Sequence, residues 1–372
     1  MNHILKTNPE ELVHYSSDHR VWQGIPSIEI TKKGRIFITF YSGGVTEQIG
    51  NYSVVITSRD GVHFSQPIVA AFCENHRCFD PCLWIDPLGR LWFTWSMNPD
   101  HGLYATICED PDAEELVWGD VFRVGRDIMM NKPVVLSSGE WLFPISVWNH
   151  NIRVLPAAFD SDEAEKGAFV YRTLDQGKTF QKLGRADWEN NSFDEHMILE
   201  QSDSSLLMLI RTREGIAASR SYDKGLSWTL GENGFLPGPD ARFHIRRLKS
   251  GRILLVNHVN FNGRNNLTAL LSEDEGKTWS AQLLLDERQS ISYPDVAEGE
   301  DGFLYIVYDR ERGGYLKDLQ SVYACAREIL YAKITEEDIL KGKLITEGSC
   351  LKCIASKLGE YKGSDPFMTK EK

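Results

Sequence analysis

The chain has 372 residues, 42% of them hydrophobic and 25% charged, a balance typical of a soluble globular protein with one to three domains. Its net charge of −12, without a basic arm, argues against nucleic acid as a partner. No apolar stretch has membrane-spanning length, the first residues lack the pattern of a secretion signal, and the odd count of 7 cysteines favours reduced thiols, so the expected location is the cytoplasm.

Six similar segments follow one another along the chain. Each holds an apolar run, a short polar turn and a second apolar run, which is the pattern of a β-hairpin. Their turns recur roughly every 50 residues, with one interval lengthened by an insertion around residues 150–170. The predicted hairpins cover residues 25–41, 80–96, 132–146, 195–211, 242–258 and 293–309.

A second motif follows four of these hairpins and reads Ser/Thr-x-Asp-x-Gly-x-Thr/Ser-aromatic. The Asp carboxylate can accept hydrogen bonds from the backbone of its own turn, and the Gly supplies a positive φ. The aromatic ring can be buried between neighbouring units. The copies lie at residues 58–64, which is one residue short, and at 173–180, 221–228 and 272–279.

These repeats predict an all-β fold of six units with about four strands each. Four-stranded units repeated around an axis form a β-propeller, which leaves few exposed strand edges. Residues 1–335 are therefore expected to form a six-bladed β-propeller domain. Residues 336–372 are expected to be a C-terminal extension with a short helix and a polar tail.

Alignment of the six hairpins brings their first residues together at one mouth of the propeller. Most of the aligned residues are polar or ionisable, although the rest of each strand is largely apolar. This pattern predicts a ligand site at the axis, and the alternative is that strand ends are simply exposed to solvent. The first strands open at Ile25, Asp80, Lys132, Glu195, Arg242 and Tyr293, and the second strands close at Tyr41, Ser96, Ser146, Arg211, His258 and Asp309.

With its Asp-turn repeats and these strand ends, the chain resembles the sialidase (neuraminidase) superfamily of six-bladed propellers over residues 20–335. The resemblance implies a glutamate and an arginine in blade four, which are Glu195 and Arg211. It also implies an arginine in blade five, Arg264, and a tyrosine nucleophile that opens blade six, Tyr293.

Two positions depart from the family pattern. The family opens blade one with Arg-Ile-Pro, whereas this chain reads Gly-Ile-Pro at residues 24–26, so the first of three carboxylate-binding arginines is missing. Arg242 is expected to replace it in part. The family's acid/base aspartate has its nearest counterpart in Glu47, with Asp80 as the second choice.

The chemistry implied is that of an exo-acting retaining glycoside hydrolase. A tyrosine has an ordinary pKa of about 10 and needs a neighbouring base, which Glu195 would supply to Tyr293. A tyrosine nucleophile avoids the repulsion between a carboxylate and an anionic sugar. The expected substrate is therefore a terminal acidic sugar, with sialic acid first, whose carboxylate Arg211 and Arg264 bind.

Four further residues at the mouth are predicted to bind the substrate, namely His258, Lys132, Tyr41 and Asp309. Asp309 is also predicted to hold the neighbouring Arg310 in place.

No metal or organic cofactor is expected. Residues 73–82 group three cysteines and a histidine, but their spacing matches no standard zinc pattern. The sequence CLKC at 350–353 has no second half, which favours two free thiols.

Two other functions stay open at this point, both with a carbohydrate as the partner. A polysaccharide or oligosaccharide lyase would use a tyrosine or histidine as base and an arginine to neutralise a uronate. A non-catalytic carbohydrate-binding propeller would keep the polar ring, and Tyr293 would then be a packed strand tyrosine.

Overall fold

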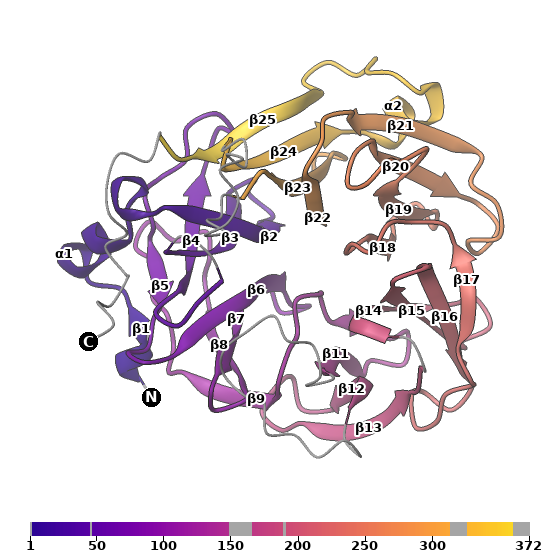
Figure 1. The fold of residues 1–372 in the computed structure, drawn as a ribbon, viewed down its shortest axis with the longest axis horizontal. Coiled ribbons are helices and arrows are strands. Elements are labelled where there is room, and N and C mark those ends of the chain that lie inside the picture. The colour runs from indigo at the N-terminus through magenta and orange to yellow at the C-terminus, as the bar shows by residue number, and fades with distance from the viewer. Residues whose placement is uncertain (1, 45–46, 149–165, 189–190, 313–325, 360–372) are drawn as a thin grey trace, which may run out of the picture.

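The computed structural model describes residues 2–44, 47–148, 166–188, 191–312 and 326–359. Its strands form six sheets around a central axis, so the predicted six-bladed β-propeller is confirmed (Figure 1). Most of the insertion expected around residues 150–170, and the polar tail beyond residue 359, lie outside the described residues.

The first three blades hold strands in chain order from the axis outward, and β1 adds a fifth strand to blade one. Blade one contains β2 (Trp22–Ile30), β3 (Ile36–Gly43), β4 (Tyr52–Ser58), β5 (Val69–Ala71) and β1 (Leu5–Lys6). Blade two contains β6 (Arg77–Ile85), β7 (Leu91–Asn98), β8 (Gly102–Cys108) and β9 (Phe122–Arg126), and blade three contains β10 (Val134–Val135), β11 (Trp141–Val147), β12 (Gly167–Thr173) and β13 (Gln181–Ala186).

The last three blades repeat this order. Blade four contains β14 (Asn191–Glu200), β15 (Leu206–Thr212), β16 (Gly215–Ser221) and β17 (Glu232–Leu236). Blade five contains β18 (His244–Arg247), β19 (Ile253–His258), β20 (Leu267–Ser272) and β21 (Ala281–Asp286), and blade six contains β22 (Ile291–Glu298), β23 (Leu304–Arg310), β24 (Glu328–Ile334) and β25 (Cys350–Lys357).

The described helices are short. They are α1 (Pro9–Leu12), α2 (Glu336–Lys341) and the 3₁₀ turns η1 (Asn2–Ile4), η2 (Val13–Tyr15) and η3 (Ser17–His19). Within the described ranges, no helix is long and apolar enough to span a membrane.

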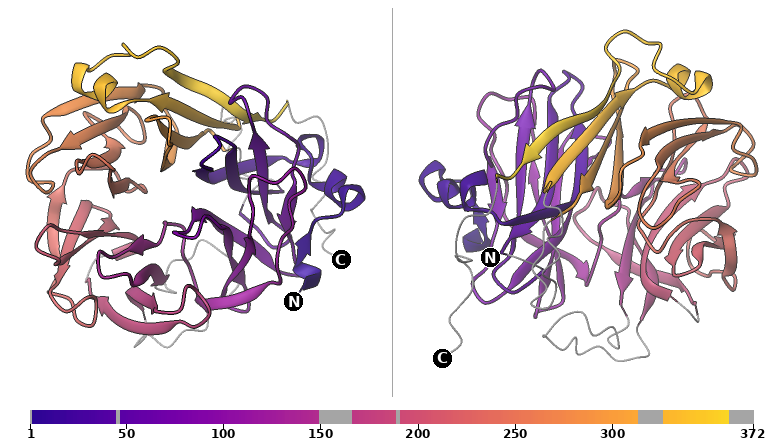
Figure 2. Two further views of the ribbon diagram at one scale, coloured as in Figure 1. Left: turned by 180° about the vertical axis from the view of Figure 1, so that it is seen from behind. Right: turned by 45° about the horizontal axis from the view of Figure 1, so that its top comes forward.

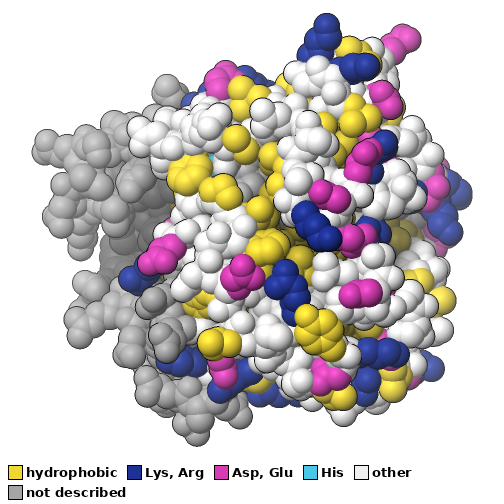
Figure 3. Space-filling view, turned by 90° about the vertical axis from the view of Figure 1, so that its right-hand side faces the viewer, with side chains coloured by type: hydrophobic (Ala, Val, Ile, Leu, Met, Phe, Trp, Pro, Cys, Tyr) yellow, Lys and Arg dark blue, Asp and Glu magenta, His cyan; other side chains and the backbone are white. Residues whose placement is uncertain are grey.

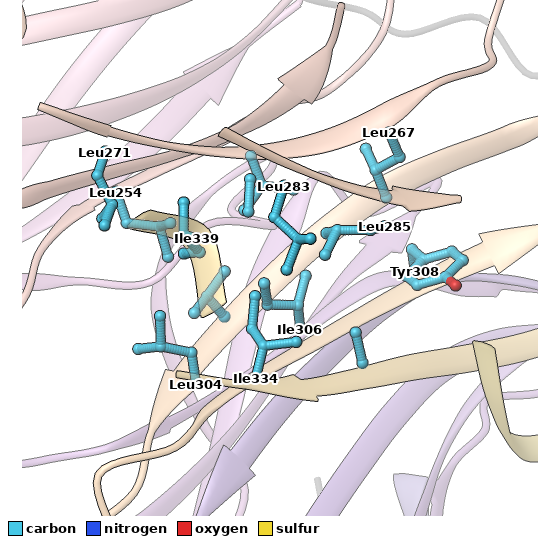
Figure 4. Close-up of a cluster of buried hydrophobic side chains, with 14 of the residues drawn as sticks. Leu254, Leu267, Leu271, Leu283, Leu285, Leu304, Ile306, Tyr308, Ile334 and Ile339 are labelled. Atoms are coloured by element: carbon cyan, nitrogen blue, oxygen red, sulfur yellow. The ribbon is translucent and has the colours of Figure 1, made fainter. Parts of the chain in front are cut away.

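The core lies between neighbouring blades rather than at the axis. The second strands of the hairpins, such as β7 and β15, are buried along their whole length because each sheet packs against a sheet on either side. Figure 4 shows one such layer, in which Leu254 and Leu271 of blade five face Leu304 and Ile306 of blade six, with Ile339 of α2 beside them.

The Asp turns are built as the sequence predicts. Asp274 accepts hydrogen bonds from the backbone N–H of Thr278 at 2.8 Å and from its hydroxyl at 2.7 Å. Asp223 makes the same pair of bonds with Ser227. The aromatic residue that ends the turn, Trp279, packs against the core between blades four and five.

The C-terminal boundary differs from the expected one. Helix α2 is present after residue 335, but β25 then pairs antiparallel with β24 and becomes the outer strand of blade six. The propeller therefore extends to at least residue 357. The predicted extension was misplaced because the short apolar run CLKCIASK carries no hairpin turn of its own.

Single hydrogen bonds join blades six and one, which share no strand among the described residues. The backbone N–H of Ile25 donates to Asp309 at 2.7 Å, and that of Ile28 donates to Asp295 at 2.9 Å. The Gln23 amide donates to the carbonyl of Arg327 at 2.6 Å. Figure 2 shows from behind that the inner strands of all six blades face the axis and the outer strands form the rim.

The surface has no dominant sign of charge on the side shown in Figure 3. Basic and acidic side chains alternate there, and hydrophobic ones are scattered between them. Charged side chains of the protein are paired in many places, as in the ion pair between Arg252 and Glu273. This mixture fits the absence of a basic stretch in the sequence.

Candidate active site

Four inner strands share a backbone irregularity near their starts. Ile25, Asp80, Glu195 and Tyr293 all have positive φ, between 37° and 56°. At the same points the pairing with the second strand shifts register, as in a β-bulge. Non-glycine residues adopt this conformation at a cost, and bulges turn side chains in new directions, often at functional sites.

Tyr293, Glu195 and Arg211 form one hydrogen-bonded cluster at this end of the axis. The Tyr293 hydroxyl donates to Glu195 Oε1 at 2.8 Å, so the predicted contact is present. One guanidinium nitrogen of Arg211 donates to the same carboxylate oxygen at 2.7 Å and lies 3.1 Å from the Tyr293 hydroxyl. Burial and the Glu195 carboxylate raise the pKa of Tyr293. Burial alone would lower the pKa of Arg211, but Glu195 and Tyr293 outweigh it and raise that pKa.

Asp240 holds two arginines beside the cluster. Its carboxylate accepts from Arg211 Nε at 2.7 Å, and its backbone carbonyl accepts from Arg264 at 2.8 Å. The Arg264 guanidinium carbon lies 5.8 Å from the centre of the Tyr293 ring. Asp240 was not predicted, although it directly precedes the aligned fifth hairpin.

Arg312 fills the space left by the missing arginine of blade one. A Cβ atom on Gly24 would lie 2.5 Å from Arg312 Cδ. The Arg312 guanidinium sits 4.1 Å from the centre of the Tyr293 ring and donates to Asp309 at 2.8 Å. A third arginine therefore reaches the cluster from the end of blade six, where the sequence pattern did not point.

Asp80 is a buried carboxyl group in the same region. Burial first, and the neighbouring Glu47 carboxylate second, raise its pKa to about 8. Glu47 lies 3.6 Å from Arg77 and 3.8 Å from Arg312. A carboxyl group with this pKa is largely protonated at neutral pH and can serve as an acid, whereas Glu47 is engaged by two cations.

An apolar collar surrounds the phenol of Tyr293. It includes Ile25 from blade one and Phe79 from blade two, with Trp148 packed at its edge. Trp148 also contacts Phe193, over whose ring the Arg211 guanidinium lies at 4.9 Å. The collar limits water around the hydroxyl, which strengthens the electrostatic interactions there.

Two predicted substrate contacts instead belong to a buried network below the cluster. Arg242 is fully buried and donates to Asn131 at 2.6 Å and to the carbonyl of Met130 at 2.9 Å, so it cannot replace the missing arginine. Lys132 donates to two backbone carbonyls and pairs with Glu29. Arg242 is enclosed in the core of the ring, whereas Lys132 also lines a cavity and stays a predicted contact.

The other three predicted contacts are also buried. Tyr41 is 0% exposed and accepts a hydrogen bond from Asn51. His258 donates from Nδ1 to the carbonyl of Asn265 at 2.7 Å, and burial lowers its pKa to about 4. Asp309 is 0% exposed and fixes Arg312, whereas the predicted partner Arg310 pairs with Glu328 instead.

A cavity of about 450 Å³ lies at the opposite ends of the inner strands. Its lining includes Lys132 together with Glu29, Trp84, Glu200, Arg246 and Glu298, which lie at or near the far ends of the first strands of their blades. The cavity is therefore separated from Tyr293 by the length of the inner strands and by the network around Lys132. Among the described residues, no group of three or more His, Cys, Asp or Glu side chains could hold a metal ion.

Comparison with known proteins agrees with this architecture. The profile described as BNR repeat-like domain matches residues 73–306. No curated protein sequence matches the chain.

Several solved structures share the fold. A Dyadobacter fermentans protein of unknown function has a TM-score of 0.59 and 16% identity over 79% of this chain and 92% of its own. The Hadza microbial sialidase Hz136 has a TM-score of 0.62 and 17% identity over 78% of this chain, and the match spans less than two thirds of its own length, 64%. The intramolecular trans-sialidase from Ruminococcus gnavus, in complex with oseltamivir carboxylate, has a TM-score of 0.61 and 14% identity over 88% of this chain and 96% of its own. At these identities the likeness concerns the fold alone.

Proposed function

The chain belongs to the family of BNR repeat-like domains, and on that fold we propose that it is a retaining exo-glycosidase of the sialidase type, which releases a terminal acidic sugar. The observation that carries the proposal is the hydrogen bond of 2.8 Å between the Tyr293 hydroxyl and Glu195, with Arg211 on both groups. A phenol joined to a carboxylate base is the pair that covalent catalysis by tyrosine requires.

In the first half of the reaction, the Tyr293 oxygen attacks the anomeric carbon while Glu195 takes the phenolic proton. Arg211 stabilises the negative charge that develops on the phenol oxygen, because its guanidinium already lies 3.1 Å away. Protonated Asp80 donates its proton to the departing glycosidic oxygen, so the alcohol leaves neutral and the sugar remains on Tyr293.

In the second half, the Asp80 carboxylate removes a proton from a water molecule that attacks the anomeric carbon. The bond to Tyr293 breaks, and Glu195 returns its proton to the phenolate. Two displacements at one carbon give retention of configuration. Asp80 is preferred over Glu47 as the acid because its pKa of about 8 keeps it protonated near neutral pH.

An acidic substrate is proposed because three arginines surround the phenol. Arg211, Arg264 and Arg312 each approach the Tyr293 side chain, and guanidinium groups bind carboxylates through paired hydrogen bonds. Sialic acid, in which a carboxylate is attached to the anomeric carbon, fits such a set of cations next to the nucleophile.

The lyase alternative loses its histidine base in this arrangement. His258 is buried against Asn265, and no described contact joins it to Tyr293. A carbohydrate-binding propeller without activity remains an outcome of the experiment below.

The test is turnover of a fluorogenic sialoside beside a uronoside and a neutral glycoside, with the Tyr293→Phe variant. The matched control is Tyr305→Phe, which removes another tyrosine hydroxyl of blade six that donates to Asp301. We expect sialoside turnover that falls roughly 1,000-fold or more in Tyr293→Phe and is unchanged in the control. Unimpaired turnover by Tyr293→Phe contradicts the mechanism, an unsaturated product absorbing in the ultraviolet indicates a lyase, and binding without turnover indicates a lectin-like propeller.

A further inference from the structure

Two cysteines on the outer strand of blade six face each other. Cys350 Sγ and Cys353 Sγ are 2.7 Å apart, closer than two unbonded sulfur atoms normally rest. A disulfide requires about 2.05 Å, so only a small movement separates the thiols from a bond. We propose that Cys350 and Cys353 are a site of reversible oxidative modification, at which a small-molecule disulfide converts the dithiol into an intramolecular disulfide.

The backbone of β25 is shaped for this bond. Cys350 pairs with Lys333 and Cys353 with Tyr331, so four residues of β25 stand opposite three of β24. The extra residue is accommodated as a bulge in which Lys352 has φ of 60°. The bulge brings side chains three positions apart onto one side, whereas in a regular strand residues three apart point to opposite faces.

The two sulfur atoms differ in pKa, and neither is enclosed in the core. Both side chains are half-buried rather than enclosed, on a strand that, among the described strands, pairs with β24 alone. The hydrogen bond from Cys353, aided by Lys333, lowers the pKa of Cys350, so this sulfur is the one of the pair that ionises first. A thiolate is the form that attacks disulfides.

With oxidised glutathione as the oxidant, the atoms and electrons of the exchange balance. The Cys350 thiolate attacks one sulfur of the glutathione disulfide and displaces a glutathione thiolate. Cys353 then loses its proton and attacks Cys350 Sγ in the mixed disulfide, which displaces the second glutathione. The protein loses two electrons and two protons, and one glutathione disulfide becomes two thiols.

Oxidation would restrict the movement of β25, a strand that helps to close the ring. Further along β25, Ser356 donates from its hydroxyl to Gln23 at 3.0 Å and accepts from the Gln23 amide on its carbonyl at 3.2 Å. The Gln23 backbone in turn donates to the carbonyl of Arg312. A covalent link across the bulge restricts the register of β25 and thus favours the closed seam between blades six and one.

The experiment treats the full-length protein with oxidised glutathione, blocks free thiols and maps peptides by mass spectrometry. We expect the peptide with Cys350 and Cys353 to be lighter by two hydrogen atoms and to resist alkylation. In the Cys350→Ser and Cys353→Ser single variants, the remaining cysteine can end only as a mixed disulfide with glutathione or as a free thiol. Two alkylated thiols, or two glutathione adducts, in the wild-type peptide would overturn the proposal.

Thermal unfolding gives an independent readout. The oxidised wild-type protein should unfold a few degrees higher than the reduced protein, while the same oxidant should not shift the Cys350→Ser/Cys353→Ser double variant. If the disulfide forms without raising the unfolding midpoint, it does not stabilise the contact between blades six and one. An equal rise in the double variant would assign the effect to other cysteines.

Discussion

At the scale of single residues, the phenol of Tyr293 meets the carboxylate of Glu195 although 98 positions separate them in the chain. Their meeting depends on two bulged strand starts, both with positive φ, that turn these side chains toward the same point. Arg211 then bridges the pair, so the base, the nucleophile and the stabilising cation form one preorganised unit.

Arg312 should determine the preference for an acidic substrate. Its replacement by alanine removes charge-assisted hydrogen bonds to the carboxylate, and we expect kcat/KM to fall roughly 10- to 100-fold on the acidic substrate. The loss should be much smaller on the methyl ester of the same substrate. Arg310→Ala is the matched control, because Arg310 pairs with Glu328 instead. An equal loss on acid and ester would contradict this role.

The position of the missing arginine offers a rescue experiment. The flexible methylene groups of Arg312 occupy the space that a side chain at position 24 would take. The double variant Gly24→Arg/Arg312→Ala exchanges one arginine for another at the same place and should regain part of the activity that Arg312→Ala loses. Gly24→Arg alone should be impaired, because two side chains then compete for one space. Kinetics on the acidic substrate decide between these outcomes.

Activity should fall at alkaline pH as Asp80 loses its proton. The folded-state pKa of about 8 lies above the ordinary value, so the acid form persists through neutral pH and disappears above it. Glu47→Gln removes a negative charge that raises this pKa, and the alkaline limb of kcat/KM should then move to lower pH. A pH profile of both proteins tests this, and a shift to higher pH would exclude Asp80 as the acid.

The sequence located some of these residues and missed others for a physical reason. Tyr293, Glu195 and Arg211 lie within the six repeated hairpins, where alignment on the turns determines their place. Arg312 lies just past the end of β23, where the path of the chain depends on Asp309 and not on a repeat. In the sequence Asp-Arg-Glu-Arg at 309–312, Arg310 was predicted as the partner of Asp309. In the structure the partner is Arg312.

At the scale of the strands, Asp295 joins three inner elements below the site. Its carboxylate accepts from the Ser27 hydroxyl at 2.6 Å and the Ile28 N–H at 2.9 Å, and it lies 3.1 Å from Lys132. Burial would raise the pKa of Asp295, but Lys132 and its other partners outweigh burial and lower it. Through this buried network, Lys132 and Arg242 support the inner strands.

Asp295→Ala should destabilise the protein strongly. It removes one of the two carboxylates that pair with Lys132, the other being Glu29, and breaking a buried pair costs about 3–5 kcal/mol. Chemical denaturation should show a lower free energy of unfolding. Glu300→Ala is a suitable control, because Glu300 lies on an exposed turn of the same blade, where its ion pair with exposed Lys249 should contribute little. Equal stability of the two variants would contradict a role for the Asp295 network.

At the scale of the whole molecule, the repeats predicted the number of blades but not how the ring closes. Four Asp turns and six hairpins recur in the sequence, so the blade count follows from periodicity. The closure depends on single contacts such as Ile25 with Asp309 and Gln23 with Arg327, which have no counterpart in the repeat. The outer strand β25 was missed for the same reason.

A truncation measures the contribution of β25 to the ring. A chain that ends at residue 349 exposes the edge of β24 and loses the contacts of Ser356 with Gln23, so we expect a lower unfolding temperature and aggregation. A chain that ends at residue 359 keeps the strand and serves as the control. Calorimetry and size-exclusion chromatography compare the two. Equal behaviour would place residues 350–357 outside the folded unit.

The most direct measurement of the central claim is the identity of the residue that carries the sugar. The reagent is a sialosyl fluoride with a second fluorine on the carbon next to the anomeric carbon. The second fluorine slows both displacements. The fluoride leaving group makes the first displacement faster than the second, so the covalent intermediate accumulates. The account predicts a protein heavier by one sugar, with the added mass on the peptide containing Tyr293, and no labelling of Tyr293→Phe. Turnover of the natural linkage with the label on another residue, or with no covalent species at all, would contradict it.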